Sequence, residues 1–408
     1  MIRTNEAERI ESVRLFALFP LVMTILDPYA LTEGGGLFLC DILAVFLAVY
    51  LILKNKCALY RPLLVLLAVD FMLTVFAFIL TDSSNTSLGL ALKVAIAFLL
   101  YLLVYSSVWI FDIRASFYQF AEAIGLLCAV LAILQFVFAS MGMEFYDGRL
   151  FFPLGEGSYF GGLYDKNTHD LRVHSFFEEP SYLAFFEIPI TIHLIQEKKY
   201  IKAVICGISC ILSGSMTGIL GLFLALAASF LFDRGGKQKH RLQLAALILL
   251  VVIAFIFFYN TVDSLKDLID YYVNRISNIG SSSRRENSSF SQRIFGNIAL
   301  FSDYNSINKI IGVGFNQYPL FFGINKDYSN DFVSNLLNFG YIGLLFMIGA
   351  LFSMIRRSAA SSRTFILIFI MLLAVDHSWF GTMFFYLLTW IVMKSETNQK
   401  DRFLKIKF

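Results

Sequence analysis

Charged residues are scarce in this sequence. They make up only 15% of its 408 residues, whereas hydrophobic residues make up 58% and aromatic residues 16%. The mean hydropathy is +0.69, and soluble domains carry about 25% charged residues. The sequence therefore predicts a single integral membrane domain over residues 1–408 and argues against an additional soluble domain.

Three further absences exclude other classes of protein. The net charge of +3 is too small to indicate a nucleic-acid partner. The five cysteines fall in apolar stretches or in one short basic loop, so no disulfide framework is expected. Neither of the two longest polar segments contains an Asp-x-Asp pair, and we therefore expect a reaction that uses no metal and no other cofactor.

Twelve apolar stretches approach the length of a membrane-spanning helix, which is roughly 17 to 25 residues. They lie at about 15–31, 36–53, 62–80, 88–111, 119–141, 181–196, 199–213, 215–232, 241–260, 332–355, 363–377 and 378–393. The pairs 199–213 with 215–232 and 363–377 with 378–393 are short, and each permits one long helix or a re-entrant turn. The sequence thus predicts an all-α polytopic membrane protein with about twelve transmembrane helices.

Lys and Arg are distributed unevenly between these stretches. If the N-terminus is cytoplasmic, most of the 33 Lys and Arg fall in cytoplasmic segments, and the short outer loops near 32–35, 81–87, 214 and 378 contain none. Short cytoplasmic loops of membrane proteins collect basic residues. Because single helices in place of the short pairs would disturb this pattern, we expect twelve helices with both termini in the cytoplasm.

Two long loops then lie outside, at residues 142–180 and 261–331. Loops of this length between packed helices are usually functional or disordered. Apolar residues recur at helical spacing over 262–276, so we expect an amphipathic helix on the membrane surface there.

The first long loop ends in a group of charged residues. Arg172, His174, Glu178 and Glu179 precede a proline, which suits the first turn of a helix. Interaction with the helix dipole is a structural explanation for the two glutamates. It does not explain Arg172, His174 or Glu187, which lies two turns into the apolar helix, so we expect the group to form the rim of an outer polar pocket.

The second long loop carries Arg293 in a helical pattern. An arginine there can direct its planar guanidinium at a phosphate, or it can pair with Glu286 on the surface. Further on, Gly312 and Gly314 flank one valine, a spacing found more often in a turn than in a phosphate-binding loop. Asp331 stands at the start of the next apolar helix, where a carboxylate can also cap the helix.

Three parts of the sequence, in this order, resemble the O-antigen polymerase and ligase superfamily of membrane glycosyltransferases. They are RVHSFFEEPSYLAFF from residue 172, LSGSMTGILGLFLAL from residue 212, and SQRIFGNIALF, KIIGVGFNQY and SNDFVSNLLNFGYIGLL within 291–345. The resemblance covers about residues 172–350 and depends on the order of the motifs and their placement on one membrane face. It implies a GT-C-like membrane glycosyltransferase.

One motif departs from the ligase pattern. Ligases of the superfamily carry His-Asn where this sequence has Ser329 and Asn330. The resemblance therefore implies a Wzy-type polymerase that joins undecaprenyl-pyrophosphate-linked oligosaccharides into O-antigen, capsular or exopolysaccharide chains. The active face would lie outward in the bacterial cytoplasmic membrane, with a chain-length regulator and a flippase as partners. An O-antigen ligase and a flippase are the alternative functions.

The resemblance also implies which residues contact the substrate. Arg172 and Arg293 would stabilise the charge that develops on the leaving pyrophosphate. Glu187, Gly312 and Gly314 are further candidates for substrate binding.

The acceptor hydroxyl needs a base within hydrogen-bond reach. Asp331, Glu178, Glu179 and His174 are the candidates, and we expect inversion at the anomeric carbon.

A transporter would also contain many helices and buried charges such as Asp70 and Lys93. Transporters commonly contain internal repeats, and no repeat is evident between the two halves of this chain. A scaffold for envelope assembly would not require arginine-bearing loops. We expect Asp70 and Lys93 to pair between the third and fourth helices.

The predicted topology can be tested with introduced cysteines. Ser158→Cys and Ser288→Cys should react with a membrane-impermeant maleimide in intact spheroplasts, because both positions lie in predicted outer loops. Labelling only after lysis would reverse the arrangement.

Overall fold

The computed structural model describes residues 2–34, 36–80, 86–143, 145–155, 158, 163, 171–232, 297–324, 329–356, 359–376, 378–395 and 403–406. Three predicted features lie outside these residues: the apolar stretch 241–260, the amphipathic helix over 262–276, and Arg293.

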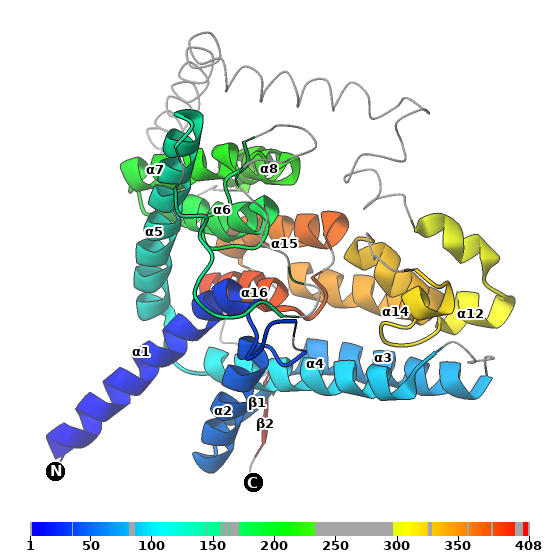
Figure 1. The fold of residues 1–408 in the computed structure, drawn as a ribbon. Coiled ribbons are helices and arrows are strands. Elements are labelled where there is room, and N and C mark those ends of the chain that lie inside the picture. Colours follow the sequence, from blue (N-terminus) through cyan, green and yellow to red (C-terminus); the bar gives the residue numbers. More distant parts are fainter. Residues whose placement is uncertain are drawn as a thin grey trace.

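Helices form most of the described chain (Figure 1). The α-helices are α1 (Ile2–Leu26), α2 (Leu39–Leu53), α3 (Arg61–Leu80), α4 (Leu88–Trp109), α5 (Arg114–Ser140), α6 (Pro180–Gln196), α7 (Tyr200–Leu212), α8 (Met216–Phe232), α12 (Ser306–Ile311), α13 (Tyr318–Phe321), α14 (Asp331–Arg356), α15 (Arg363–Val375) and α16 (Thr382–Lys394). Short 3-10 helices lie at Ile298–Asp303 and Ala360–Ser362, and the strands are β1 (Cys57–Tyr60) and β2 (Phe403–Ile406). Every predicted apolar stretch among the described residues coincides with a helix, and both short pairs are separate helices.

Four of the described helices, α3, α4, α5 and α14, are long and apolar enough to cross a membrane. Helices α7, α15 and α16 have 13 residues each. At about 1.5 Å per residue such a helix measures about 20 Å, less than the ~30 Å hydrocarbon core of a bilayer. The all-α polytopic class is therefore confirmed, with long spanning helices packed beside shorter apolar ones.

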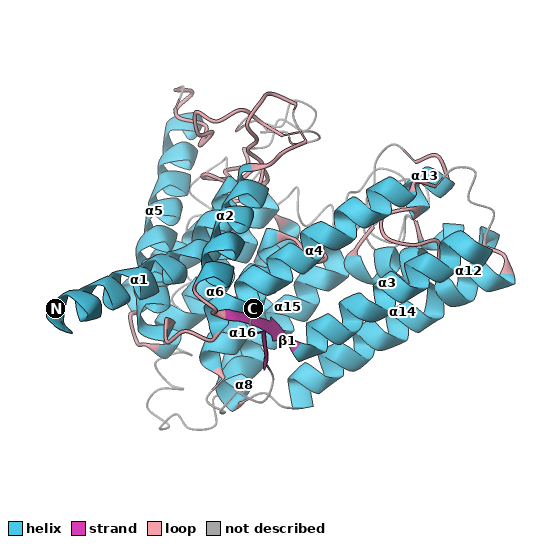
Figure 2. Ribbon diagram, turned by 90° about the horizontal axis from the view of Figure 1, so that it is seen from below, coloured by secondary structure: helices cyan, strands magenta, loops and turns pink. Residues whose placement is uncertain are grey.

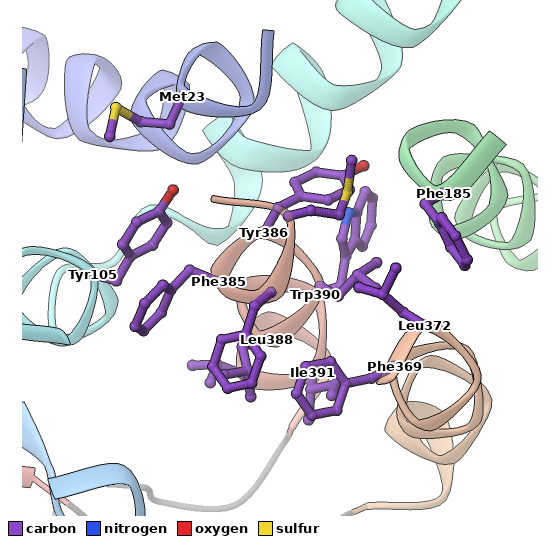
Figure 3. Packing of buried hydrophobic residues seen from close by; sticks show 14 of the residues in the cluster. Met23, Tyr105, Phe185, Phe369, Leu372, Phe385, Tyr386, Leu388, Trp390 and Ile391 are labelled. Atoms are coloured by element: carbon purple, nitrogen blue, oxygen red, sulfur yellow. The ribbon is translucent and has the colours of Figure 1, made fainter. Parts of the chain in front are cut away.

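Helix α16 lies at the centre of the core. Its residues are buried from Thr382 to Met393, as expected for a helix that is apolar on every side. Figure 1 shows it between α4 on one side and α6 and α15 on the other. Phe385 stacks on Tyr105 of α4 with ring centroids 4.7 Å apart, and Tyr386 stacks on Phe186 of α6 at 4.9 Å. Figure 3 shows Phe385 and Tyr386 pointing to different sides of the helix.

Segments that were predicted to be cytoplasmic meet at one end of the structure. Strand β1, from the loop before α3, pairs with β2 near the C-terminus (Figure 2). Lys199 and Lys202 form salt bridges with Glu122 of α5, and the Arg114 guanidinium donates to the Ser395 carbonyl at 3.1 Å. Because such contacts cannot form across a bilayer, these segments share one side, in agreement with the predicted grouping.

Segments that were predicted to be outside also contact one another. The Ala30 amide donates to the Pro153 carbonyl at 2.8 Å, which joins the loop after α1 to the first long loop. The Ser87 amide donates to Gln317 Oε1 at 2.7 Å, which joins the start of α4 to the second long loop. The alternation of sides read from the basic residues therefore agrees with the contacts.

Helix α14 is broken at Gly340, which has φ +65° and ψ −163°. The Asn338 carbonyl there accepts hydrogen bonds from the amides of Val313 at 3.0 Å and Gly314 at 2.7 Å. A Cβ atom at Gly340 would lie 2.4 Å from the Ile310 carbonyl oxygen. Only glycine fits both the backbone conformation and this close approach.

Alanine at Gly340 should therefore destabilise the protein. We expect a loss of about 1–3 kcal/mol from backbone strain alone, with further loss from overpacking, measured as a lower thermal unfolding midpoint in detergent. Gly349, on the same helix, is the matched control because nothing lies within 4 Å of a Cβ built there. Gly349→Ala should be neutral or slightly stabilising, and equal midpoints for the two variants would contradict this account of the break.

Candidate functional site

Gln135 of α5 holds the segment 171–179 that leads into α6. The Ser175 amide donates to Gln135 Oε1 at 2.9 Å, and Gln135 Nε2 donates to the Ser175 carbonyl at 3.4 Å. Gln135 is fully buried, so these bonds satisfy an amide that would otherwise be costly inside the core. In the sequence, Gln135 is a single amide side chain within the apolar stretch 119–141, and this isolated polar residue is the feature that could have indicated its role.

Two apolar side chains anchor the same segment. Val173 and Phe177 are buried, and the Phe177 ring lies 5.0 Å from the Phe186 ring of α6. Arg172 and Glu178 lie directly beside these anchors in sequence and are only partly buried. The segment thus holds two charged residues on an ordered backbone ahead of the helix.

Four carboxylates lie close enough to Tyr182, in the first turn of α6, for their charges to act on it. The charges of Asp376, Glu179, Asp27 and Glu178 all act on its phenol group. They come from the end of α1, from the segment before α6 and from the turn between α15 and α16. These five residues, here named the carboxylate cluster, lie at the end of α16 opposite Lys394.

The carboxylates of the cluster differ in their surroundings. Glu178 and Glu179 are half-buried, and Glu179 Oε2 accepts a hydrogen bond from Ser181 Oγ at 3.0 Å. Asp376 is only 6% exposed. The structural explanation by helix position holds for Glu179, which is the residue before the first turn of α6.

Asp27 directly follows the last residue of α1. The residue is exposed, yet the surrounding protein removes enough hydration to raise the pKa of its carboxyl to about 6. A hydrogen bond from Thr382 opposes this rise, and the nearby charge of Asp41 adds to it. A carboxylate whose pKa lies close to neutral accepts a proton more readily than an ordinary aspartate.

Sequence reasoning missed Asp27 and Asp376. Each is a single charged residue at the outer end of a predicted apolar stretch. That position is the feature from which a place in an outer site could have been inferred.

Arg172 is half-buried, and its Nε has no hydrogen-bond partner among the residues that the structure describes. Arg172 thus stays a candidate for contact with an anionic ligand, because no ion pair engages it among the described residues. His174 is only 1% exposed, which makes it poorly placed to reach an acceptor. Arg293, the second predicted phosphate-binding arginine, lies outside the described residues.

Asp331 holds the turn between α15 and α16. Its Oδ1 accepts from the amides of Ser378 at 3.0 Å and Trp379 at 2.9 Å, and its Oδ2 accepts from Ser378 Oγ at 3.1 Å. The Asp331 amide in turn donates to the Asp376 carbonyl at 3.0 Å. Asp331 therefore positions a member of the carboxylate cluster, and both its oxygens are engaged by the turn.

The expected capping role belongs to the preceding residue. Asn330 Oδ1 accepts from the Val333 amide at 2.9 Å, which caps α14. The alternative explanation of Asp331 as a helix cap is thus not needed, because Asn330 fills that position.

Glu187 lies apart from the cluster. It is fully buried in α6, and a Cβ built at Gly125 of α5 would lie 3.3 Å from its Oε2. Neither of its carboxylate oxygens has a hydrogen-bond partner among the described residues, and Cys206 of α7 lies beside them. The side chain is thus enclosed between α5 and α7, and the expectation that it belongs to an outer pocket rim is not met.

The Gly-x-Gly turn is structural. The Gly312 amide donates to the Asn308 carbonyl at 2.8 Å, and the Gly314 amide donates to the Asn338 carbonyl. A phosphate cradle requires backbone amides that point at the ligand. The amides of Gly312 and Gly314 are already used within the chain, so the predicted substrate contact through them is not supported.

The predicted pairing of Asp70 with Lys93 is wrong. Asp70 is fully buried in α3 beside the Trp379 indole, whereas Lys93 is exposed on α4. The two side chains lie on helix faces that hydropathy alone does not orient.

Removal of the Asp331 carboxylate should destabilise the turn. Asp331→Ala leaves the partly buried amides of Ser378 and Trp379 without their acceptor, which costs up to about 1–3 kcal/mol each, whereas Asp331→Asn keeps one acceptor oxygen. We expect a clearly lower thermal unfolding midpoint for Asp331→Ala than for Asp331→Asn. Equal midpoints near that of the wild type would show that these hydrogen bonds contribute little.

Two family models match the chain. The model of the WcaD colanic acid polymerase family matches residues 18–269, and that of the O-antigen ligase family matches residues 201–348. Comparison with curated proteins gives no match. The resemblance to the O-antigen polymerase and ligase superfamily is thus confirmed. Because the first match covers more than half of the chain, the protein belongs to the WcaD colanic acid polymerase family.

Proposed function

We propose that this protein is a Wzy-type polymerase, which joins oligosaccharide repeat units carried on undecaprenyl pyrophosphate into a surface polysaccharide. One observation carries the proposal: the two matched regions meet at one place. Glu178, Glu179 and Tyr182 lie in the region matched by the polymerase family, and Asp331 lies in the region matched by the ligase family. Asp376 joins them, since its charge acts on Tyr182 and its carbonyl accepts from the Asp331 amide.

In this reaction the acceptor hydroxyl attacks the anomeric carbon of the donor sugar. A new carbon–oxygen bond forms, the bond to the lipid pyrophosphate breaks, and the hydroxyl proton passes to a base. Attack from the face opposite the leaving group inverts the anomeric carbon. The leaving group carries away the bonding electrons, so cations that hold it stabilise the transition state most strongly.

Arg172 supplies such a cation from the segment before α6. Its planar guanidinium can bind two phosphate oxygens at once, and its partly buried position strengthens the interaction relative to bulk water. Arg293 is the second candidate for the same role.

The carboxylate cluster supplies the base. Asp27, Glu178 and Glu179 are its members with solvent access, and desolvation raises the pKa of the Asp27 carboxyl to about 6, which suits it to accept a proton. Asp331 acts as a positioning residue in this proposal, because its oxygens are occupied by the turn. The chemistry needs no metal ion.

The proposal includes the full topology. Twelve helices in a GT-C-like arrangement keep both termini in the cytoplasm and direct the carboxylate cluster outward, where lipid-linked substrates delivered by a flippase would arrive. A chain-length regulator would bind the same complex.

An O-antigen ligase is the second candidate function, and the match of residues 201–348 to the ligase family favours it. The absence of the ligase His-Asn pair at Ser329 and Asn330 counts against it. The two functions leave different products in cells.

Deletion of the gene, with surface polysaccharide separated on a gel, distinguishes these functions. A strain without the polymerase should keep single repeat units attached to the carrier lipid or its acceptor and lose the long chains. Loss of attached units of every length would indicate a ligase, and a block of export would indicate a transporter. Unchanged long chains would overturn the proposed function.

Complementation of that strain tests the arginine. Arg172→Lys should restore little polymer, because lysine offers a point charge without the bidentate geometry. Arg149→Lys is the matched control and should restore normal polymer. Arg149 lies in the same long loop but is exposed, with its Nη2 3.4 Å from Glu33 Oε2. Arg293→Lys should behave like Arg172→Lys. Full polymer from Arg172→Lys, at equal protein level, would remove Arg172 from the mechanism.

A further inference from the structure

A cavity of about 240 Å³ lies between α4, the turn after α12, α14 and the turn between α15 and α16. Phe98, Phe315 and Phe339 give its wall apolar aromatic surface. Asn335, Asn338 and Trp379 contribute groups that can form hydrogen bonds. No lining residue of this cavity carries a charge.

Asn335 is the feature that distinguishes this cavity from a packing defect. Its side chain is only 2% exposed, and neither Oδ1 nor Nδ2 has a hydrogen-bond partner within the described part of the chain. Trp379 adds its indole to the same wall, and the carboxylate of Asp70 lies beside that indole. A buried polar group without a partner costs about 1–3 kcal/mol, so the Asn335 amide is suited to a ligand that supplies its partners.

Asn338 provides an internal comparison on the same wall. Its Oδ1 accepts from the amides of Gln317 at 3.1 Å and Tyr318 at 3.4 Å, and its Nδ2 donates to Ser334 Oγ at 3.2 Å. The residue is of the same type and lies one turn away, but its side chain holds the neighbouring turn in place. Asn335 makes no such contribution to the fold.

The chemistry of the wall selects among possible occupants. A phosphate would meet no cation, and an acyl chain would leave the Asn335 amide unsatisfied. Hydroxyl groups both donate and accept hydrogen bonds, so they can satisfy both the oxygen and the nitrogen of the Asn335 amide. Phe98, Phe315 and Phe339 offer apolar surface on which the C–H face of a pyranose can pack. Water could not make this apolar contact.

We propose that this cavity binds one pyranose ring of the saccharide substrate. The proposal rests on the proposed function for the choice of a saccharide, and it adds a second site to the carboxylate cluster. The Trp379 amide is held by Asp331, whose own amide is bonded to Asp376. The turn between α15 and α16 thus connects the sugar cavity to the cluster and would hold a ring of the acceptor chain near the base.

A binding measurement on the full-length protein in detergent tests the cavity directly. Methyl glycosides of glucose, galactose, mannose and N-acetylglucosamine are titrated while tryptophan emission is recorded, with mannitol as the open-chain control. At least one glycoside should give a saturable change that mannitol does not. Asn335→Leu, which loses the polar atoms at similar size, should weaken that binding about tenfold or more, and Trp379→Phe should abolish the signal.

Stability separates a binding role from a structural one. Asn335→Leu should unfold at the same or a higher temperature than the wild type, because it removes unsatisfied buried atoms. Asn338→Leu, the matched control, should unfold at a lower temperature because three hydrogen bonds are lost.

The outcomes distinguish the two proposals. No saturable binding by any glycoside, or equal binding by Asn335→Leu, would mean that the cavity holds water only and would overturn the sugar site, even if gene deletion abolishes polymer. Saturable binding with unchanged polymer after deletion would support the sugar site and overturn the polymerase.

Discussion

The hydrogen bonds of the Asp331 carboxylate connect the parts of the molecule on which its chemistry depends. They hold the start of α14 against the turn between α15 and α16. That turn carries Asp376 into the carboxylate cluster and Trp379 into the wall of the cavity. A carboxylate that accepts hydrogen bonds from two backbone amides and a hydroxyl is stabilised by each of them. One buried acidic side chain therefore fixes the spacing between two sites assembled from segments far apart in the sequence.

The helices could be predicted from the sequence because hydropathy and the distribution of basic residues are summed over many residues. The separation of α15 from α16 followed from the absence of Lys and Arg near residue 378. The orientation of single side chains could not be predicted in this way. Asp70 and Lys93 carry opposite charges on adjacent helices, yet Asp70 points to Trp379 and Lys93 to the surface. A rotation of one helix by a third of a turn changes such a pairing, and an all-apolar helix gives no face from which to read that rotation.

The same limit applies to the candidate site. The group of charges before α6 was evident because several charged residues cluster in a very apolar chain. Asp27 and Asp376 are single residues in distant parts of the sequence, and they join the cluster only through the packing of α1 and α16. Asn335 is equally inconspicuous, since Asn338 lies on the same face of α14 and differs only in its partners. Whether a buried amide holds the fold or faces a cavity depends on contacts with the turn after α12, which no local pattern reveals.

The sign of the charges determines how a substrate could lie across these sites. Carboxylates of the cluster repel a pyrophosphate, and at an effective dielectric constant of 20 two unit charges 4 Å apart interact by about 4 kcal/mol. The anionic end of a lipid-linked donor is therefore expected at Arg172, whose positive charge attracts it. The neutral sugar of an acceptor meets no such repulsion, and the uncharged wall at Asn335 adds none. A cation that attracts the donor pyrophosphate and an uncharged cavity that accepts a sugar would thus orient donor and acceptor before any bond forms, which lowers the entropic part of the barrier.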